Sequence, residues 1–465
     1  MHPAILESDA TEFHRWHKEG YEQAKKLLPL VHSEIDAGAV LRFYMAGYQD
    51  SHINGYLDHT PYSKIDLPER KWTGWLLKAT NTGYVVVYRK DGKNYPPENA
   101  RLLSCDGQQI DNILKTHYAP YFDLRWQVLD ARDTAAKAFT QNRSNTGVLN
   151  RPEFQNCDFM VNDQSVTYPI QWMPISEVES IAIKAKSHSE YKLPQLFKLA
   201  PDILWVRASD FALYTSEAVQ SQKKLVEELA SSKGKALIIL DTRGNGGGSS
   251  VHGTDIFHAL FENDEKAGKY LANKYQYQFQ GSNALFRASW QLYWSYEVAL
   301  KETIATQGKE SVVVKHLERF LERLKNALDS GEKTLFQNEF ADENNTTTEP
   351  SEKWESTIKL VLITDKSCVS ACLDFVDIVK LVPNLLHLGE PTDADTAYTQ
   401  IAYMQSEYLK ETYNFMVPVK KWNNRMREDN KPYIPDVIYE GDMNDDKALE
   451  KWVLEQANQH FSKML

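Results

Sequence analysis

The fold class of this chain is decided by one stretch, Leu240-Asp241-Thr242-Arg243-Gly244-Asn245-Gly246-Gly247-Gly248-Ser249. It continues the apolar run at residues 236–240, which predicts a buried strand. Glycines after such a strand let backbone N–H groups approach a ligand closely, at the edge where open α/β sheets bind ligands. The turn lacks the Gly-Lys-Ser/Thr of a Walker loop and the G-x-G-x-x-G order of a dinucleotide site. It therefore predicts a backbone site for an oxyanion or phosphate, or simply a tight turn.

The segments around this turn alternate between strand and helix patterns. Residues 203–206 and 236–240 are short apolar runs, and residues 217–230 between them have a helical pattern. A second strand, helix, strand unit consists of residues 358–363, a helix after Ser370, and residues 385–388. Repeated units of this kind are typical of a parallel sheet. We therefore expect an α/β fold, with α and β segments mixed along the chain.

A second informative segment is Ser-Cys-Val-Ser-Ala-Cys-Leu-Asp at residues 367–374. It also follows a predicted buried strand and opens a predicted helix. The helix dipole and the unpaired N–H groups at a helix N-terminus favour an alkoxide, so Ser370 is a candidate nucleophile. The alternative is an ordinary serine N-cap.

Composition limits the function classes. The chain has 465 residues, 42% hydrophobic and 25% charged, with a formal net charge of -11. This acidic balance disfavours nucleic acid, which needs a clustered basic face. No stretch approaches the ~20 apolar residues of a membrane span, so we expect a soluble protein. The four cysteines lack a paired zinc pattern and are too few for a disulfide scaffold, although one bridge is compatible with them. No metal or cofactor is expected.

Three parts are predicted along the chain, in keeping with its length. Residues 1–75 form an N-terminal helical region that ends in a polar loop. Residues 76–175 form a small β-rich module, with a degenerate PDZ-like fold as one interpretation. Residues 176–465 form the α/β core. A helical insertion interrupts this core at about residues 261–355, and its polar segment 338–351 is expected to be a mobile loop.

The order of these motifs resembles peptidase family S41, the C-terminal processing and tricorn-core proteases. The resemblance spans residues 204–436 apart from the insertion, and it includes the strand end Leu-Gly-Glu-Pro-Thr at residues 388–392. It implies a ClpP/crotonase-type ββα core with Ser370 as the nucleophile. It also implies that Gly246 or Gly247, together with Ala371, provides the N–H groups of an oxyanion hole.

The resemblance points to one branch of that family. Bacterial processing proteases take a lysine base from the loop after Gly-Glu-Pro-Thr, but residues 392–398 contain two aspartates and no lysine. The tricorn-like branch takes its base from an N-terminal Ser-His pair, which matches Ser51-His52. The same branch uses a glutamate shortly before a Pro-Asp, which matches Glu428. By this resemblance Glu428 orients Ser51 and, through it, His52, with the adjacent Asp429 as the alternative residue.

These residues form a chemically sensible set. An imidazole with a pKa near 6.5 can accept a serine proton at neutral pH, and fixed N–H donors stabilise the oxyanion that forms. We therefore expect a serine-type peptidase that acts through an acyl-enzyme on a peptide or protein substrate.

Two alternatives remain open. One is a non-catalytic S41-like protein that binds a peptide or an apolar ligand, as the interphotoreceptor retinoid-binding repeats do. A dry, aromatic-lined cavity would favour it. The other is a structural protein with a decayed site, in which Ser370 and His52 would lie far apart. The resemblance favours an extracytoplasmic location, periplasmic or secreted with a signal removed, over the cytoplasm. Substrate, cleavage specificity and oligomeric state are not predicted.

Overall fold

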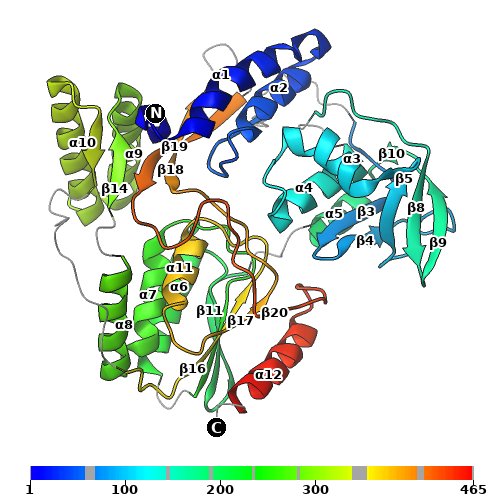
Figure 1. Ribbon diagram of the computed structural model, residues 1–465. Helices are drawn as coiled ribbons and strands as arrows, with labels where there is room; N and C mark the ends of the chain where they lie inside the picture. The colour runs from blue at the N-terminus through cyan, green and yellow to red at the C-terminus, as the bar shows by residue number, and fades with distance from the viewer. Residues whose placement is uncertain are drawn as a thin grey trace.

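The computed structural model describes residues 2–57, 69–142, 147–187, 192–232, 236–279, 283–337, 353–405 and 413–462. The predicted loop at residues 338–351 lies outside these ranges. Figure 1 shows an α/β unit with the C-terminus, a β-rich module beside it, and the N-terminal helices at the far end. None of the described helices is long and apolar enough to cross a lipid bilayer.

The α/β unit is built on a six-stranded sheet. Its strand order is β11 (Gln195–Ala200), β12 (Ile203–Arg207), β13 (Leu237–Asp241), β16 (Lys359–Thr364), β17 (Leu386–Gly389) and β20 (Val437–Ile438). Strand β11 is antiparallel to β12, and the other neighbours pair in parallel. The predicted α/β fold is confirmed.

Helices cover both faces of this sheet, which explains the continuous apolar runs of its strands. On one face Leu240 and Leu362 pack against α6 (Ser216–Ser231), α7 (Ser250–Phe261) and α11 (Ala371–Val379). Helix α8 (Glu265–Gln278) adds Leu271 to this core. On the other face Ile239 and Val361 pack against α12 (Asp446–Ser462).

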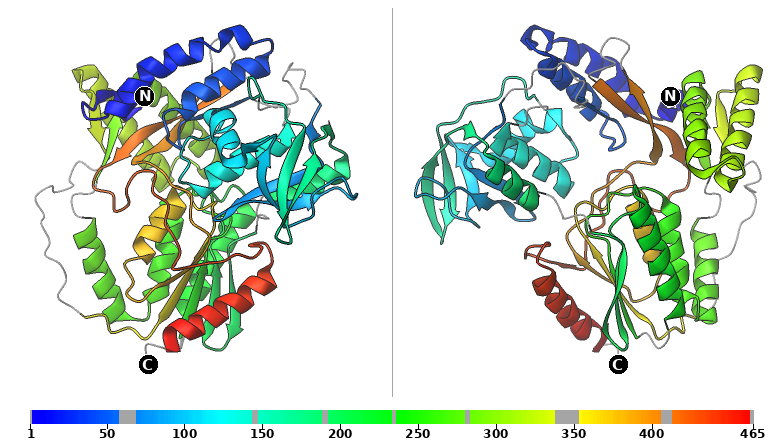
Figure 2. Two further views of the ribbon diagram at one scale, coloured as in Figure 1. Left: turned by 45° about the vertical axis from the view of Figure 1, so that its right-hand side comes forward. Right: turned by 180° about the vertical axis from the view of Figure 1, so that it is seen from behind.

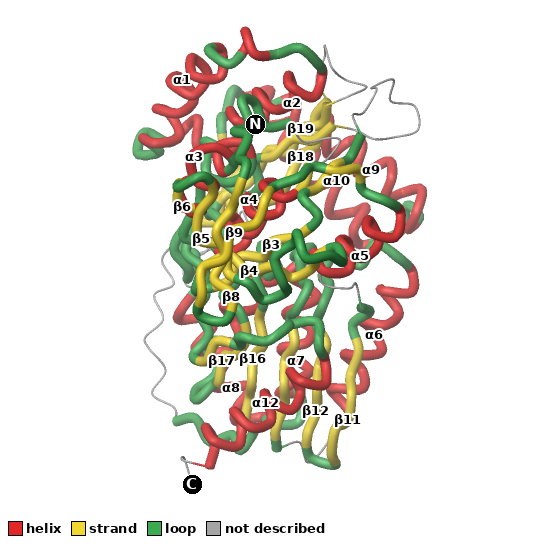
Figure 3. Tube along the Cα trace, turned by 90° about the vertical axis from the view of Figure 1, so that its right-hand side faces the viewer, coloured by secondary structure: helices red, strands yellow, loops and turns green. Residues whose placement is uncertain are grey.

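The β-rich module has an antiparallel sheet of its own. Its order is β3 (Trp75–Thr80), β4 (Gly83–Arg89), β5 (Arg101–Cys105), β8 (Asn156–Val161) and β9 (Gln164–Pro169), and β6 (Gln108–Gln109) pairs with β5. Helices α3 (Ile110–His117) and α4 (Leu129–Thr140) pack on it. A disulfide between Cys105 and Cys157 joins β5 to β8. Figure 3 shows this sheet and the parallel sheet as two separate groups of strands.

Short elements surround the module and the N-terminal region. The strands β10 (Met173–Pro174), β2 (Lys71–Trp72) and β7 (Gln141–Asn142) form a small sheet. Helix α5 (Glu177–Ser187) contacts β4. The remaining short helices are η1 (Pro3–Leu6), η2 (Leu28–Leu30) and η3 (Ala119–Tyr121).

A third sheet joins segments that are remote in sequence. The N-terminal helices α1 (Thr11–Lys25) and α2 (Glu34–Ala46) lead into β1 (Asn54–Leu57), which pairs with β19 (Tyr413–Trp422). Strand β19 also pairs with β18 (Tyr398–Gln405) and with β14 (Ala284–Arg287), and β14 pairs with β15 (Thr334–Phe336). The insertion supplies β14 and β15 as well as α9 (Trp290–Gln307) and α10 (Val312–Ser330). Strand β1, which follows the N-terminal helices, therefore shares a sheet with strands of the insertion and of the late part of the chain (Figure 2).

Ion pairs attach the β-rich module to loops of the α/β unit. Lys366, which follows β16, pairs with the fully buried Asp133 of α4. Lys78 of β3 pairs with Glu390, which follows β17, at 2.8 Å. Burial alone would raise the pKa of Asp133, but Lys366 and Lys137 outweigh it and hold that pKa well below its usual range. Since breaking a buried pair leaves an unpaired charge, these contacts fix the module against the carboxyl edge of the parallel sheet.

Candidate active site

Ser370 stands on a strained turn between β16 and α11. Its backbone has φ 58° and ψ −122°, a conformation that non-glycine residues rarely adopt and that is concentrated at functional sites. Ser370 occupies the N-cap position of α11, but its side chain makes no capping hydrogen bond. Ser370 is therefore not an ordinary capping serine, because its hydroxyl does not hydrogen-bond a backbone N–H of the helix.

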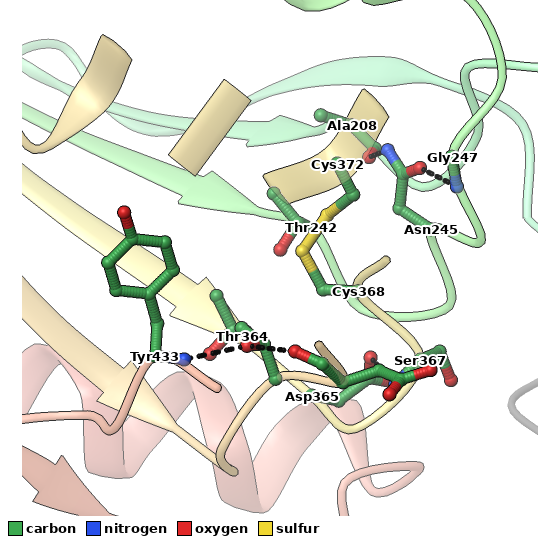
Figure 4. Close-up of a disulfide and its surroundings, with 12 residues drawn as sticks. Ala208, Thr242, Asn245, Gly247, Thr364, Asp365, Ser367, Cys368, Cys372 and Tyr433 are labelled. Atoms are coloured by element: carbon green, nitrogen blue, oxygen red, sulfur yellow. Dashed lines mark hydrogen bonds between the residues drawn. A yellow bond between two sulfur atoms is a disulfide. The ribbon is translucent and has the colours of Figure 1, made fainter. Parts of the chain in front are cut away.

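The glycine turn after β13 packs directly against this serine. A Cβ atom on Gly247, whose φ is +89°, would lie 2.7 Å from the Val369 carbonyl oxygen and 2.9 Å from the Ser370 Cβ. Only glycine fits such an approach. The buried Asn245 fixes the turn: its Nδ2 donates to the Ala208 carbonyl at 2.6 Å, and its Oδ1 accepts the Gly247 N–H at 2.9 Å (Figure 4).

Two further links hold the turn at Ser370. Asp365 accepts the N–H groups of Gly244 and Ser367, both at 3.0 Å, and so connects the glycine turn to the loop before α11. Cys368 and Cys372 are joined by a buried disulfide (Figure 4). The two cysteines lie on either side of Ser370 in the sequence. The sequence indicated that one bridge was compatible with the four cysteines. The structure instead has two bridges, because each pair of cysteines lies within bonding reach.

His52 reaches Ser370 from a distant part of the chain. It lies in the loop between α2 and β1, and the pairing of β1 with β19 carries this loop to the carboxyl edge of the parallel sheet. The residue is 5% exposed, and the Nε2 of its ring lies 3.4 Å from the Ser370 Oγ across 318 residues of sequence. Such contacts are often long without substrate and tighten when substrate binds.

Asp50 lies on the other side of the imidazole. Its Oδ1 is 3.6 Å from the His52 Nδ1 and accepts a hydrogen bond from the backbone N–H of His52 at 2.9 Å. Its Oδ2 accepts the Thr396 hydroxyl at 3.0 Å and lies 3.5 Å from the His2 Nε2. This carboxylate was not among the sequence candidates. The Asp-x-His spacing, which allows an aspartate to turn back on the N–H two residues later, is the signal that could have found it.

The charges of this pair stabilise each other. Burial alone would raise the pKa of Asp50, but His2 and His52 outweigh it and hold that pKa well below its usual range. Burial alone would lower the pKa of His52, but Asp50, with a smaller contribution from Asp395, raises it above its ordinary value. The arrangement therefore favours a protonated imidazole beside an ionised carboxylate.

The structure does not bring Glu428 to Ser51 or His52. The Glu428 side chain is 71% exposed and pairs with Lys431 at 2.5 Å. The neighbouring Asp429 accepts the Ala397 N–H at 2.8 Å and pairs with Arg425. Ser51 lines the cleft, but its buried hydroxyl has no hydrogen-bond partner among the described residues.

The two aspartates of the loop after β17 form ion pairs. Asp393 pairs with Arg125 of the β-rich module at 3.3 Å. Asp395 pairs with Arg425 and with Arg427, the latter at 2.8 Å. These contacts order the loop that lies against His52, and neither aspartate hydrogen-bonds the imidazole in the described structure.

The candidate oxyanion donors differ in availability. The Gly247 N–H is already donated to Asn245, which removes it as a free donor. Ala371 is the first residue of α11, where a backbone N–H has no partner within the helix. Gly246 lines the cleft beside Ser370, and a Cβ added to it would meet nothing within 4 Å.

Ser370 and His52 open into a cleft of about 940 Å³. One wall comes from the glycine turn and the start of α7, and the opposite wall from β18 and β19. Tyr214 and Trp422 are the aromatic residues among the described residues that line it, and polar and charged side chains make up much of the rest. The cleft therefore differs from the dry, aromatic-lined cavity expected of an apolar-ligand carrier.

Comparisons with known proteins agree with this architecture. The family model described as peptidase family S41 matches residues 202–437, about half of the chain. No curated protein sequence matches the chain.

Three solved structures of CPAF share the fold at 12% identity. Mature CPAF complexed with lactacystin has a TM-score of 0.58, and the match covers 97% of this chain and 95% of that chain. Mature CPAF alone has a TM-score of 0.55, with 90% and 85% covered. A CPAF mutant has a TM-score of 0.54, with 92% and 89% covered. The likeness extends beyond the α/β unit over nearly the whole length of both chains.

Proposed function

Since the chain belongs to peptidase family S41, we propose that it hydrolyses peptide bonds by serine catalysis, with Ser370 as nucleophile and His52 as general base. The observation that carries this proposal is the 3.4 Å separation between the His52 Nε2 and the Ser370 Oγ. The strained, uncapped serine supports it, because that backbone holds the hydroxyl toward the cleft.

In the first step the Ser370 Oγ attacks the carbonyl carbon of the scissile bond while the His52 Nε2 accepts the hydroxyl proton. The negative charge that develops on the carbonyl oxygen is stabilised by the N–H of Ala371 and by that of Gly246. Asp50 stabilises the imidazolium and holds the imidazole in one orientation. In our proposal Asp50 takes the place that the sequence suggested for Glu428.

In the second step the imidazolium gives its proton to the leaving amine, and the C–N bond breaks to leave an acyl-enzyme on Ser370. A water molecule then attacks the ester carbonyl while His52 accepts a proton from it. His52 returns this proton to the Ser370 Oγ as the ester C–O bond breaks, which releases the acid product and restores the free enzyme.

A fluorophosphonate probe tests this assignment. We expect one adduct on the wild-type protein, located on Ser370 by peptide mapping, and no adduct on Ser370→Ala. A labelled Ser370→Ala variant would place the nucleophile elsewhere. An unlabelled wild-type protein would favour the non-catalytic binding protein.

The pH dependence of peptide hydrolysis follows from the pKa of His52. The base must be neutral, so kcat/KM rises with pH through the His52 pKa of the free enzyme. Because Asp50 raises that pKa, we expect the acid limb to lie at higher pH than the ordinary titration of a histidine. In Asp50→Asn the carboxylate is lost while the burial that lowers the His52 pKa remains. We therefore expect the acid limb of the kcat/KM profile to move to lower pH. An unchanged limb in this variant would show that Asp50 does not act on the base.

Removal of each disulfide is expected to have a different effect. The chain-entropy relation gives about 2 kcal/mol for a bridge across 4 residues and about 4 kcal/mol across 52 residues. We therefore expect the double replacement of Cys105 and Cys157 by serine to lower the free energy of unfolding more. The double replacement of Cys368 and Cys372 by serine should have the larger effect on catalysis. We expect it to lower kcat by about 100-fold, because it releases the turn that positions Ser370. Denaturant unfolding and peptide kinetics measure the two effects. Equal losses of kcat would contradict the positioning role.

The two bridges also bear on location. Disulfides persist mainly in oxidising compartments. We therefore propose that the protein works outside the cytoplasm. Cell fractionation tests this proposal, and co-purification of the protein with cytoplasmic markers would contradict it.

A further inference from the structure

Lys420 is a cation in the wall of the cleft. It lies on β19, where it lines the same cleft as Ser370. Its Nζ donates to the Gln337 Oε1 at 3.3 Å and lies 5.0 Å from the ring centre of Trp422 and 5.8 Å from that of Phe286. Ring faces and an amide oxygen attract an ammonium, but none of them carries a countercharge.

The carboxylates among the described lining residues already have partners. Asp374 pairs with Arg427 at 2.9 Å, Asp393 pairs with Arg125 at 3.3 Å, and Asp210 accepts the Ala212 N–H at 2.8 Å. Among the residues that the structure describes, no carboxylate lies within ion-pair distance of Lys420. The cleft therefore contains one lysine charge that is not matched from within the described chain.

The environment of Lys420 makes this unmatched charge significant. Burial lowers the pKa of Lys420 to about 8, with Asp374 acting in the opposite direction. The ammonium is therefore mostly protonated at neutral pH although water solvates it poorly. A carboxylate that enters the cleft would gain a charge-assisted hydrogen bond, which is about twice as strong as a neutral one.

We propose that Lys420 is a specificity-determining residue that binds a carboxylate of the peptide substrate. This rests on the proposed peptide hydrolysis at Ser370. The carboxylate comes from an aspartate or glutamate side chain or from the C-terminus of the peptide. Both sources offer the same planar pair of oxygens to the ammonium, and a peptide positioned for attack by Ser370 passes along the wall that Lys420 lines.

The adjacent Lys421 is a matched control. Neighbouring residues of a strand point to opposite sides. The Lys421 Nζ pairs with Glu7 at 2.7 Å and lies 5.6 Å from the ring centre of Tyr398, and Lys421 is not among the residues that line the cleft. Replacing either lysine with methionine removes the same charge and keeps a similar apolar volume.

The experiment measures kcat/KM for quenched fluorescent peptides in matched pairs. One arm compares glutamate with glutamine at each position around the cleavage site. The other arm compares a free C-terminal carboxylate with a C-terminal amide. We expect the wild-type protein to prefer the acid member of at least one pair by roughly 10- to 100-fold. We expect Lys420→Met to reduce this ratio to about one and Lys421→Met to leave it unchanged. The arm that responds identifies the source of the carboxylate.

Two results would overturn the proposal: a wild-type ratio near one in both arms, or a preference that survives in Lys420→Met. Its failure is distinct from failure of the proposed function. Hydrolysis that requires Ser370 but ignores the acid pairs rejects Lys420 alone, whereas a wild-type protein that cleaves no peptide rejects the function. In the latter case fluorescence anisotropy of the same peptides on the Ser370→Ala variant still tests Lys420. Acid peptides should bind tighter by the same factor, and equal binding rejects the proposal.

Discussion

Ser370→Ala lowers kcat for peptide hydrolysis by roughly 10⁴- to 10⁶-fold, the range spanned when single members of a protease triad are removed. The variant keeps the glycine turn, the disulfide and the imidazole, so it loses only the oxygen that forms the acyl-enzyme. Steady-state kinetics on a peptide that the wild-type protein cleaves measure the effect.

The fold of this variant provides the control. Alanine and serine have similar backbone preferences, so the strain at φ 58° is the same in both proteins. We expect the midpoint of thermal unfolding to change by only a few degrees. A variant that unfolds normally yet retains more than about one-tenth of wild-type kcat would exclude Ser370 as the nucleophile.

His52→Ala has the second-largest expected effect, a loss of kcat of roughly 10⁴-fold or more, because the serine proton then has no acceptor. Residues that act as one unit are not additive. We therefore expect the double variant with Ser370→Ala to be no slower than Ser370→Ala alone. Multiplied effects in the double variant would indicate that the two residues work independently.

Substitution of Asp50, the carboxylate beside the His52 ring, tests the same catalytic group with a smaller expected effect. Asp50→Asn keeps the side-chain shape but removes the charge 3.6 Å from the His52 Nδ1, so we expect kcat to fall by roughly 10²- to 10⁴-fold. Glu428→Gln is the comparison, because the exposed Glu428 pairs with Lys431 at the surface. We expect little change there. The reverse order of effects would assign the orienting role to Glu428 and require a rearrangement of its loop with substrate.

The parallel sheet is largely predictable from sequence because its strands are buried on both faces. Residues 236–240 and 358–363 are continuous apolar runs, and each is followed by a polar loop and a helical pattern. The same logic places Ser370 at the carboxyl edge of the sheet. The order of motifs, rather than any single one, points to peptidase family S41, and the family match over residues 202–437 agrees with it.

The rest depends on long-range packing. No local pattern indicates that β1 pairs with β19, and this pairing is what brings His52 to the sheet edge. The Cys105–Cys157 bridge also cannot be predicted from local sequence, because it forms only when the pairing of β5 with β8 places the two cysteines opposite each other. Asp50 carries a local signal, its spacing from His52, but its selection over Glu428 depends on which carboxylate the folded chain places beside the imidazole.

The central claim is that Ser370 and His52 act on one carbonyl group, and a crystal structure of the phosphonylated protein tests it most directly. The account predicts phosphorus bonded to the Ser370 Oγ, a phosphonyl oxygen within hydrogen-bond distance of the Ala371 N–H, and the His52 Nε2 within hydrogen-bond distance of an oxygen on phosphorus. Phosphorus on another residue, or a His52 ring turned away from the adduct with protein packed between them, would contradict it.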